Sequence, residues 1–138
     1  MSRFKISRAV LFGDCDPAGV IYTPRIAHYV VEAVLEFQSH IMGMPAARAI
    51  MALGVLPPAR ELNIEFLAPL SYDDTLAIEV GVAHIGDTSF ACAVDAIRQD
   101  GVPAFRARFT QVCVSVDDKR PYPLPDELRD ALSSYFAG

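Results

Sequence analysis

The sequence predicts an α+β fold in which a five-stranded antiparallel sheet curls around one long, mostly apolar helix. Two patterns carry this prediction: a helical hydrophobic period fills residues 24–42, and a period of two marks one strand before the helix and four after it. The 138 residues are 52% hydrophobic and 21% charged, which is enough apolar material for one core. We therefore expect a single domain spanning residues 1–138.

The long helix is predicted between Thr23 and Gly43. Threonine commonly caps a helix N-terminus, Pro24 suits the first helical position, and Gly43 is a typical stop. The apolar residues of this segment cover more than half of the helix circumference; they are Ile26, Tyr29, Val30, Ala33, Val34, Phe37 and Ile41. A helix with so wide an apolar surface has to be surrounded, which is why we expect the sheet to wrap it.

The strands are recognised by alternation of apolar and polar residues. The expected strands cover residues 4–12, 61–66, 75–82, 90–97 and 104–116. The dipeptide Asp100-Gly101 is a strong hairpin signal between the last two. Beyond a proline-rich stretch, Glu127–Phe136 is expected to form a short amphipathic helix.

Composition and charge exclude several classes of partner. Twelve basic and 17 acidic residues give a net charge of −5, which argues against a nucleic-acid partner. No apolar run approaches the roughly 20 residues of a membrane span, and Met1–Arg8 lacks the apolar stretch of a secretion signal. We expect a cytoplasmic protein with no membrane partner.

One long helix cannot hide both faces of a five-stranded sheet, so association through a sheet edge or the outer face is expected. The sequence thus favours a homo-oligomer, either a dimer or a homotetramer built as a dimer of dimers.

The cysteines Cys15, Cys92 and Cys113 are odd in number and follow no metal-binding spacing. We expect them to be reduced, with no disulfide framework and no zinc site.

Asp14 and Asp16 flank Cys15 in a Gly- and Pro-containing turn directly ahead of the helix. Three interpretations of these aspartates stay open on residue types alone. They can cap the turn by accepting backbone N–H groups, or bind a metal with His28 as a further ligand. They can also act in catalysis at a helix N-terminus, where free N–H groups favour developing negative charge.

The stretch Phe12–Tyr22 reads Phe-Gly-Asp-Cys-Asp-Pro-Ala-Gly-Val-Ile-Tyr and resembles the signature loop of the 4-hydroxybenzoyl-CoA thioesterase family of hotdog-fold proteins. Further matches cover almost the whole chain; they lie at Pro24, Ser71–Asp74, Ser89-Phe90 and Lys119–Pro121. The resemblance implies an acyl-CoA thioesterase without metal or cofactor. Its substrate would be an aromatic or a short to medium aliphatic acyl-CoA.

The same resemblance assigns the catalytic carboxylate to Asp16 and the N–H that polarises the thioester carbonyl to Thr23, while Asp14 shapes the loop. The assignment of Thr23 agrees with the predicted helix N-terminus, where backbone N–H groups are unpaired. Asp16 can attack the carbonyl directly and form an anhydride, or take a proton from an attacking water. Both routes stay open.

The candidates for binding the acyl group are Tyr22, His28, Val31 and Glu32. His28 and Glu32 lie four residues apart, so they can form a polar pair on one helix face or orient water and substrate beside Asp16. Members of the family often carry an acid at the position of Val31, where it meets a polar acyl group. The apolar Val31 therefore predicts an acyl group without a para-hydroxyl.

The phosphates of CoA require cations near the pocket mouth. The candidates are Arg60, Arg106, Arg108, Lys119 and Arg120. Cys15 is disfavoured as a nucleophile because neighbouring carboxylates raise a thiol pKa.

Two alternative functions remain. A hotdog-fold hydratase or dehydratase would require an Asp–His or His–Glu pair in a different loop, and no such loop is evident. A non-catalytic module that binds acyl-CoA or acyl-carrier protein would use Asp16 only to shape the turn.

Overall fold

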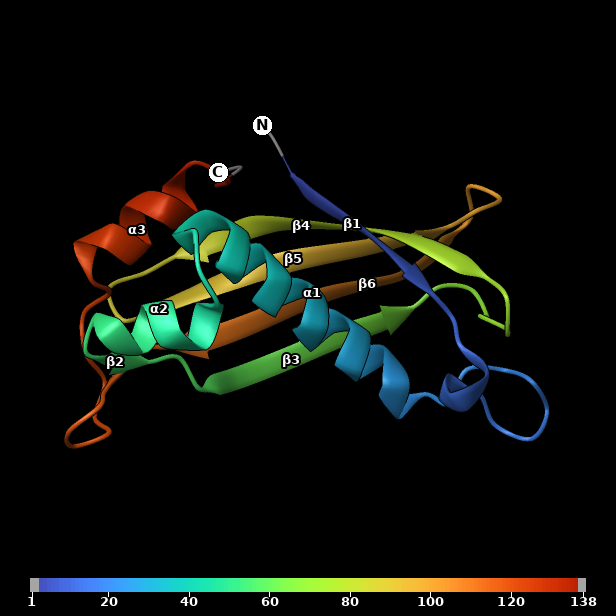
Figure 1. Cartoon of the computed structure of the whole chain (residues 1–138), viewed down its shortest axis with the longest axis horizontal. Helices are drawn as coiled ribbons and strands as arrows, with labels where there is room; N and C mark the ends of the chain where they lie inside the picture. Colours follow the sequence, from blue (N-terminus) through green and yellow to red (C-terminus); the bar gives the residue numbers. More distant parts are fainter. Residues whose placement is uncertain (1–2, 137–138) are drawn as a thin grey trace.

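The computed structural model describes residues 3–136, which are organised around a five-stranded antiparallel sheet of order β1-β4-β5-β6-β3. The strands are β1 (Phe4–Ala9), β3 (Ala59–Phe66), β4 (Thr75–Ile85), β5 (Ser89–Arg98) and β6 (Pro103–Val112). Helix α1 (Pro24–Met42) lies across one face of this sheet (Figure 1). The predicted α+β architecture is confirmed.

Helix α1 buries the face that its sequence predicts. Six of its seven expected apolar residues are buried, and Ile41 is half-buried. The ring of Phe37 packs against Phe4 and Tyr135, with centroid separations of 5.9 and 5.1 Å. Burial of each large apolar side chain contributes roughly 1.5–3 kcal/mol. This face of α1 is therefore the centre of the hydrophobic core.

The sheet meets α1 with every second residue. On β4 the residues that face the helix are at most 2% exposed; they are Leu76, Ile78, Val80 and Val82. A β-bulge between Val82 and His84 then shifts the pairing with β5. The bulge explains why simple alternation predicts the strand only as far as Val82, although β4 continues to Ile85.

Strand β3 lies at the edge of the sheet and pairs with β6 alone among the described strands. Its residues Leu62 and Phe66 stand opposite Phe109 and Phe105, so they share the sheet face that carries α1. Leu62 and Phe66 are nevertheless 37% and 54% exposed. The helix leaves this edge uncovered.

Two predicted strands are shorter than expected. β1 ends at Ala9 because the chain turns into a short 3₁₀ helix, η1 (Phe12–Asp14), which leaves Phe12 exposed instead of buried. The strand expected over 104–116 breaks at Cys113 into β6 and the two-residue β7 (Val114–Ser115).

Helix α2 (Ala46–Ala52) and strand β2 (Val55–Leu56), which pairs with β7, are not predicted by the sequence pattern. Both elements are too short to display a hydrophobic period. The C-terminal helix is confirmed as α3, with bounds of Asp126–Ser133.

Candidate active site

The loop between β1 and α1 is a closed turn tied to a neighbouring segment. Cys15 bridges Ile21 across the turn, and Val20 bridges Ser71. The Ile21 amide also donates to the carbonyl of Leu70 at 2.8 Å. These bonds hold the aspartate-containing loop against the segment that precedes β4.

Asp16 lies at the exposed tip of this loop, and its carboxylate caps the turn. Oδ1 accepts hydrogen bonds from the amides of Ala18 at 2.9 Å and Val20 at 3.3 Å. Within residues 3–136, Oδ2 accepts none. The capping interpretation is thus confirmed, and it leaves one carboxylate oxygen available for chemistry.

Thr23 precedes the first residue of α1, as predicted, although its hydroxyl makes no capping bond. Its backbone is helical, with φ −47° and ψ −46°. The amides of Arg25 and Ile26 donate to the carbonyls of Tyr22 and Thr23, and Pro24 has no N–H. In the part of the chain that the structure describes, the Thr23 N–H is left without an acceptor, which suits an oxyanion site.

A hollow of about 410 Å³ opens beside the start of α1. Its lining side chains are apolar apart from that of Thr23, and they come from the loop, α1, the end of β3 and the segment after β3: Val20, Ile21, Thr23, Ile26, Phe66, Leu67, Ala68, Pro69 and Leu70. Asp16 does not line the hollow; it lies on the loop that borders it. The arrangement suits an apolar group whose carbonyl reaches the helix N-terminus.

Asp14 is 6% exposed and anchors the base of the loop. Its Oδ2 accepts hydrogen bonds from the Tyr29 hydroxyl at 2.6 Å and the Leu11 amide at 3.1 Å. Burial acts to raise the pKa of Asp14, but these two bonds, together with the charges of Arg8 and Arg25, lower it below its ordinary value. Asp14 is therefore a buried, ionised carboxylate that shapes the loop.

The predicted pair of His28 and Glu32 does not form. Glu32 accepts a hydrogen bond from Arg8 of β1 at 2.5 Å, because the guanidinium lies beside α1. His28 and Tyr22 are exposed, and Val31 is half-buried against the core. None of these four substrate-binding candidates lines the hollow beside Thr23.

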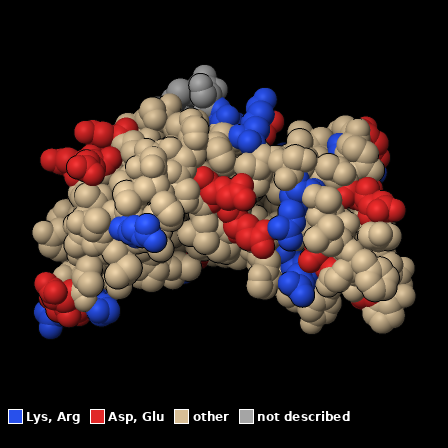
Figure 2. Space-filling view, viewed as in Figure 1, with Lys and Arg blue, Asp and Glu red and all other residues tan. Residues whose placement is uncertain are grey.

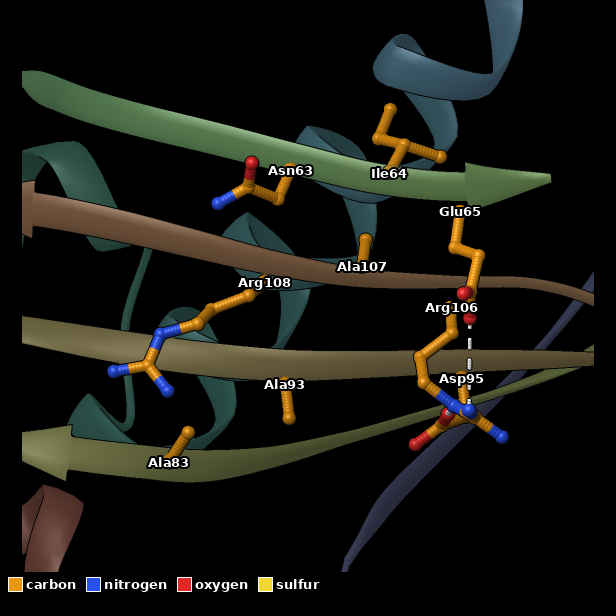
Figure 3. A pocket seen from close by; sticks show the side chains of 9 residues that line it. All are labelled: Asn63, Ile64, Glu65, Ala83, Ala93, Asp95, Arg106, Ala107 and Arg108. Atoms are coloured by element: carbon orange, nitrogen blue, oxygen red, sulfur yellow. Dashed lines mark hydrogen bonds and ion pairs between the residues drawn. The ribbon is translucent and has the colours of Figure 1, made fainter.

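The cationic candidates do not gather around Asp16 within one protomer. Arg106 and Arg108 line a separate hollow together with Asn63 of β3. In the view of Figure 3, α1 lies behind the sheet that carries these side chains. Arg106 pairs there with Asp95, at 3.2 Å, whereas Arg108 has no ion pair within residues 3–136. These two arginines lie on the sheet face opposite α1.

The other cationic candidates do not surround Asp16 either. Arg60 lies exposed on β3. Lys119 and Arg120 belong to the loop after β7, which Figure 1 places at the opposite end of the molecule from the loop between β1 and α1. A CoA bound at Asp16 thus cannot be assigned cations from these residues of the same protomer.

The cysteines behave as expected. Burial raises the pKa of Cys92 to about 12 and that of Cys113 to about 11. The pKa of Cys15 is raised by desolvation first and then by the charges of Asp14 and Asp16. All three thiols therefore stay protonated near neutral pH, which disfavours nucleophilic attack.

Sequence reasoning missed Arg8, Arg25 and Tyr29 as partners of the loop. Tyr29 carried only the signal of a core residue, and the two arginines carried none.

Among residues 3–136, no group of three or more His, Cys, Asp or Glu is arranged to hold a metal ion. In the same range, no helix is long and apolar enough to cross a membrane.

Comparison with known proteins identifies the family. Residues 10–132 match the thioesterase-like superfamily. A 1,4-dihydroxy-2-naphthoyl-CoA hydrolase of Synechococcus sp. is 30% identical over 126 residues, which cover 89% of this chain and 95% of that protein. The 4-hydroxybenzoyl-CoA thioesterase of Pseudomonas sp. is 28% identical over 86 residues, which cover 62% of this chain and 61% of that protein.

A solved structure from the thioesterase superfamily of Jannaschia sp. superposes with a TM-score of 0.90 at 27% identity, covering 99% of this chain and 95% of that one. The match extends through the Asp16 loop, α1 and the whole sheet. The fold is therefore the hotdog fold that the loop motif implies, and the chain belongs to the thioesterase-like superfamily and is a thioester hydrolase.

Proposed function

We propose that the protein hydrolyses acyl-CoA thioesters, with Asp16 as the catalytic carboxylate and the Thr23 N–H as the oxyanion donor. The observation that carries this proposal is the unpaired Thr23 amide at the start of α1, next to both the Asp16 loop and the apolar hollow. Such a donor stabilises the negative charge that develops on the carbonyl oxygen. Two relatives are named for hydrolysis of CoA thioesters of aromatic acids, which supports the same substrate class.

Two routes for Asp16 are compatible with its surroundings. In the first, the free Oδ2 attacks the carbonyl carbon, the C–S bond breaks, CoA leaves as a thiolate, and water then hydrolyses the anhydride. In the second, Asp16 accepts a proton from water while the water oxygen attacks the same carbon. In a single turnover in H₂¹⁸O, label in the Asp16 carboxylate identifies the first route, because label enters there only when water attacks Cγ of Asp16 in the anhydride.

The acyl group is assigned to the hollow beside Thr23. Its wall consists of carbon apart from the backbone and Thr23, so we propose a plain aromatic or an aliphatic acyl chain without a para-hydroxyl. The hollow, rather than Val31, now carries this proposal, because Val31 does not line it.

We further propose that the protein acts as a homo-oligomer. The unpaired edge of β3, with Leu62 and Phe66 exposed beside it, supports a dimer through this strand. A second copy also offers a source of the cations that one protomer does not bring to Asp16. Arg60, Arg106, Arg108, Lys119 and Arg120 remain the candidates for the CoA phosphates.

The experiment is a thiol-release screen over a panel of acyl-CoA substrates, run on the wild type, Asp16→Asn and Asp73→Asn. Asp73→Asn is the matched control, because Asp73 is an exposed aspartate in the segment beside the loop. Loss of Asp16 is expected to lower kcat by about 10²–10⁴-fold while acyl-CoA affinity is retained. Equal activity of wild type and Asp16→Asn would contradict the assignment, and acyl-CoA binding without turnover in the wild type would indicate a binding module.

A further inference from the structure

A compact cluster of charged and aromatic side chains lies beneath the Asp16 loop and joins it to β1 and α1. The Tyr29 hydroxyl donates to Asp14, and the guanidinium of Arg8 lies 4.4 Å above the Tyr29 ring. Arg8 also pairs with Glu32, and Arg25 Nε lies 3.8 Å from Asp14 Oδ1. Acidic and basic side chains accordingly stand side by side on the α1 face of the molecule (Figure 2).

Asp14 connects both ends of the loop. Its side chain binds the Tyr29 hydroxyl and the Leu11 amide, while its backbone carbonyl accepts a hydrogen bond from the Tyr22 amide at 2.8 Å. The segment between Asp14 and Tyr22 contains Asp16 and is thereby closed into a ring of fixed size. A displacement of Asp14 is therefore expected to move Asp16, which lies two residues along the chain.

Tyr29 belongs to the same helix that presents the Thr23 N–H. Its side chain is 1% exposed and fixed between the core and Arg8, so its hydroxyl is a fixed point relative to the start of α1. The hydrogen bond between Tyr29 and Asp14 therefore holds the loop at a set position relative to the N-terminus of α1.

The cluster is not an efficient way to stabilise a fold. The Nε of Arg8 is buried and has no hydrogen-bond partner within residues 3–136, and leaving a buried donor unpaired destabilises the folded state. Buried charged groups often stabilise a protein no better than apolar side chains of the same volume.

From this arrangement we propose that Asp14 and Tyr29 are positioning residues, which set the place of the Asp16 carboxylate relative to the Thr23 amide. The proposal rests on the proposed thioesterase function for its catalytic consequence. The hydrogen bond from Tyr29 to Asp14 that holds the loop, called the clamp below, is a property of the loop alone. Misplacement of a reacting group by about 1 Å can cost up to roughly 10²-fold in rate.

The test compares wild type with Tyr29→Phe, Asp14→Asn and the double variant. Tyr135→Phe is the matched control, since it removes a phenolic hydroxyl from a half-buried tyrosine that packs against the same helix at Phe37. Tyr29→Phe is expected to lower kcat about tenfold with KM changed less than twofold, because substrate contacts are untouched. Tyr135→Phe is expected to keep wild-type kcat.

Amide hydrogen exchange supplies a measurement that does not depend on activity. The amides of Asp16 and Tyr22, which are bonded within the loop, are expected to exchange faster in Tyr29→Phe than in Tyr135→Phe. The kcat and the loop exchange rates of the double variant should match those of the more impaired single variant, since both changes disrupt the same interaction.

Unchanged loop exchange in Tyr29→Phe would overturn the clamp, and so would additive effects in the double variant. If the wild type hydrolyses no thioester, the proposed function fails, while the exchange measurement still decides whether Tyr29 holds the loop. Faster exchange with unchanged kcat would show that the loop is held without positioning Asp16, and would overturn the catalytic role.

Discussion

Leu62 of β3 and Phe109 of β6 lie directly opposite each other on the α1 face of the sheet, yet Phe109 is 6% exposed and Leu62 is 37% exposed. The difference arises because α1 covers β6 and stops short of β3. An unpaired strand edge with apolar side chains beside it favours pairing with a second chain. In a two-fold dimer, this same surface patch of both copies would form the interface.

The first prediction concerns this edge. Leu62→Asp is expected to weaken self-association by about 2–5 kcal/mol, because an unpaired charge would be buried in each copy. Size-exclusion chromatography with light scattering over a concentration series measures the shift toward monomer. Met51→Asp, at an exposed position on α2, is the control and should associate like the wild type. A monomeric wild type would contradict this prediction.

The second prediction concerns the Thr23 amide. Thr23→Pro removes the N–H, and the φ of −47° at this position lies close to the range of proline. The variant is expected to lose about 10²–10³-fold in kcat, the usual effect of removing one oxyanion donor. Thr23→Ala retains the N–H and loses a hydroxyl that caps nothing, so its kcat should stay within about twofold of wild type. Similar losses in both variants, at unchanged thermal stability, would argue that the amide is not the donor.

The third prediction is a pH dependence of stability at Asp14. Its folded-state pKa is depressed, so its ionised form stabilises the protein above the ordinary pKa of 3.8, and this stabilisation is lost as pH falls through the folded pKa. Urea unfolding should show wild type more stable than Asp14→Asn by about 1.5–3 kcal/mol at pH 7, the usual strength of hydrogen bonds to a charged group.

The difference between wild type and Asp14→Asn is expected to shrink at pH 3. Asp73→Asn serves as the control, because it removes a carboxylate that is exposed. If the difference in unfolding free energy between wild type and Asp14→Asn stays constant or increases as the pH falls, the charge of Asp14 is not what stabilises the loop.

Sequence patterns predicted the parts of this molecule that local chemistry decides. The start and end of α1 follow from Pro24 and Gly43, and the capping role of Asp16 follows from the turn chemistry of Asp and Pro. The pairing of Asp14 with Tyr29 joins residues 15 positions apart. It depends on how the loop folds back over α1, which no local pattern contains.

The expected contact of His28 with Glu32 failed for the same reason. The helix spacing allows it, but Arg8 arrives from β1 through the tertiary fold and binds Glu32 instead. A surface pair at a spacing of four contributes only about 0.2–0.5 kcal/mol, so a tertiary ion pair easily replaces it.

The final prediction concerns the acyl group. A para-hydroxyl inside the apolar hollow would find few partners, and an unpaired buried hydroxyl costs about 1–3 kcal/mol. The value of kcat/KM for benzoyl-CoA should therefore exceed that for 4-hydroxybenzoyl-CoA by roughly tenfold, and hexanoyl-CoA should also be preferred. Leu67→Gln adds an amide to the wall of the hollow at a position that is 42% exposed, and it should reduce the ratio of kcat/KM for benzoyl-CoA to that for 4-hydroxybenzoyl-CoA. Leu11→Gln changes an exposed residue outside the hollow and should leave this ratio unchanged. A wild-type enzyme that strongly prefers 4-hydroxybenzoyl-CoA would mean that the acyl group binds elsewhere, because nothing in this wall offers the hydroxyl a partner other than Thr23 and the backbone.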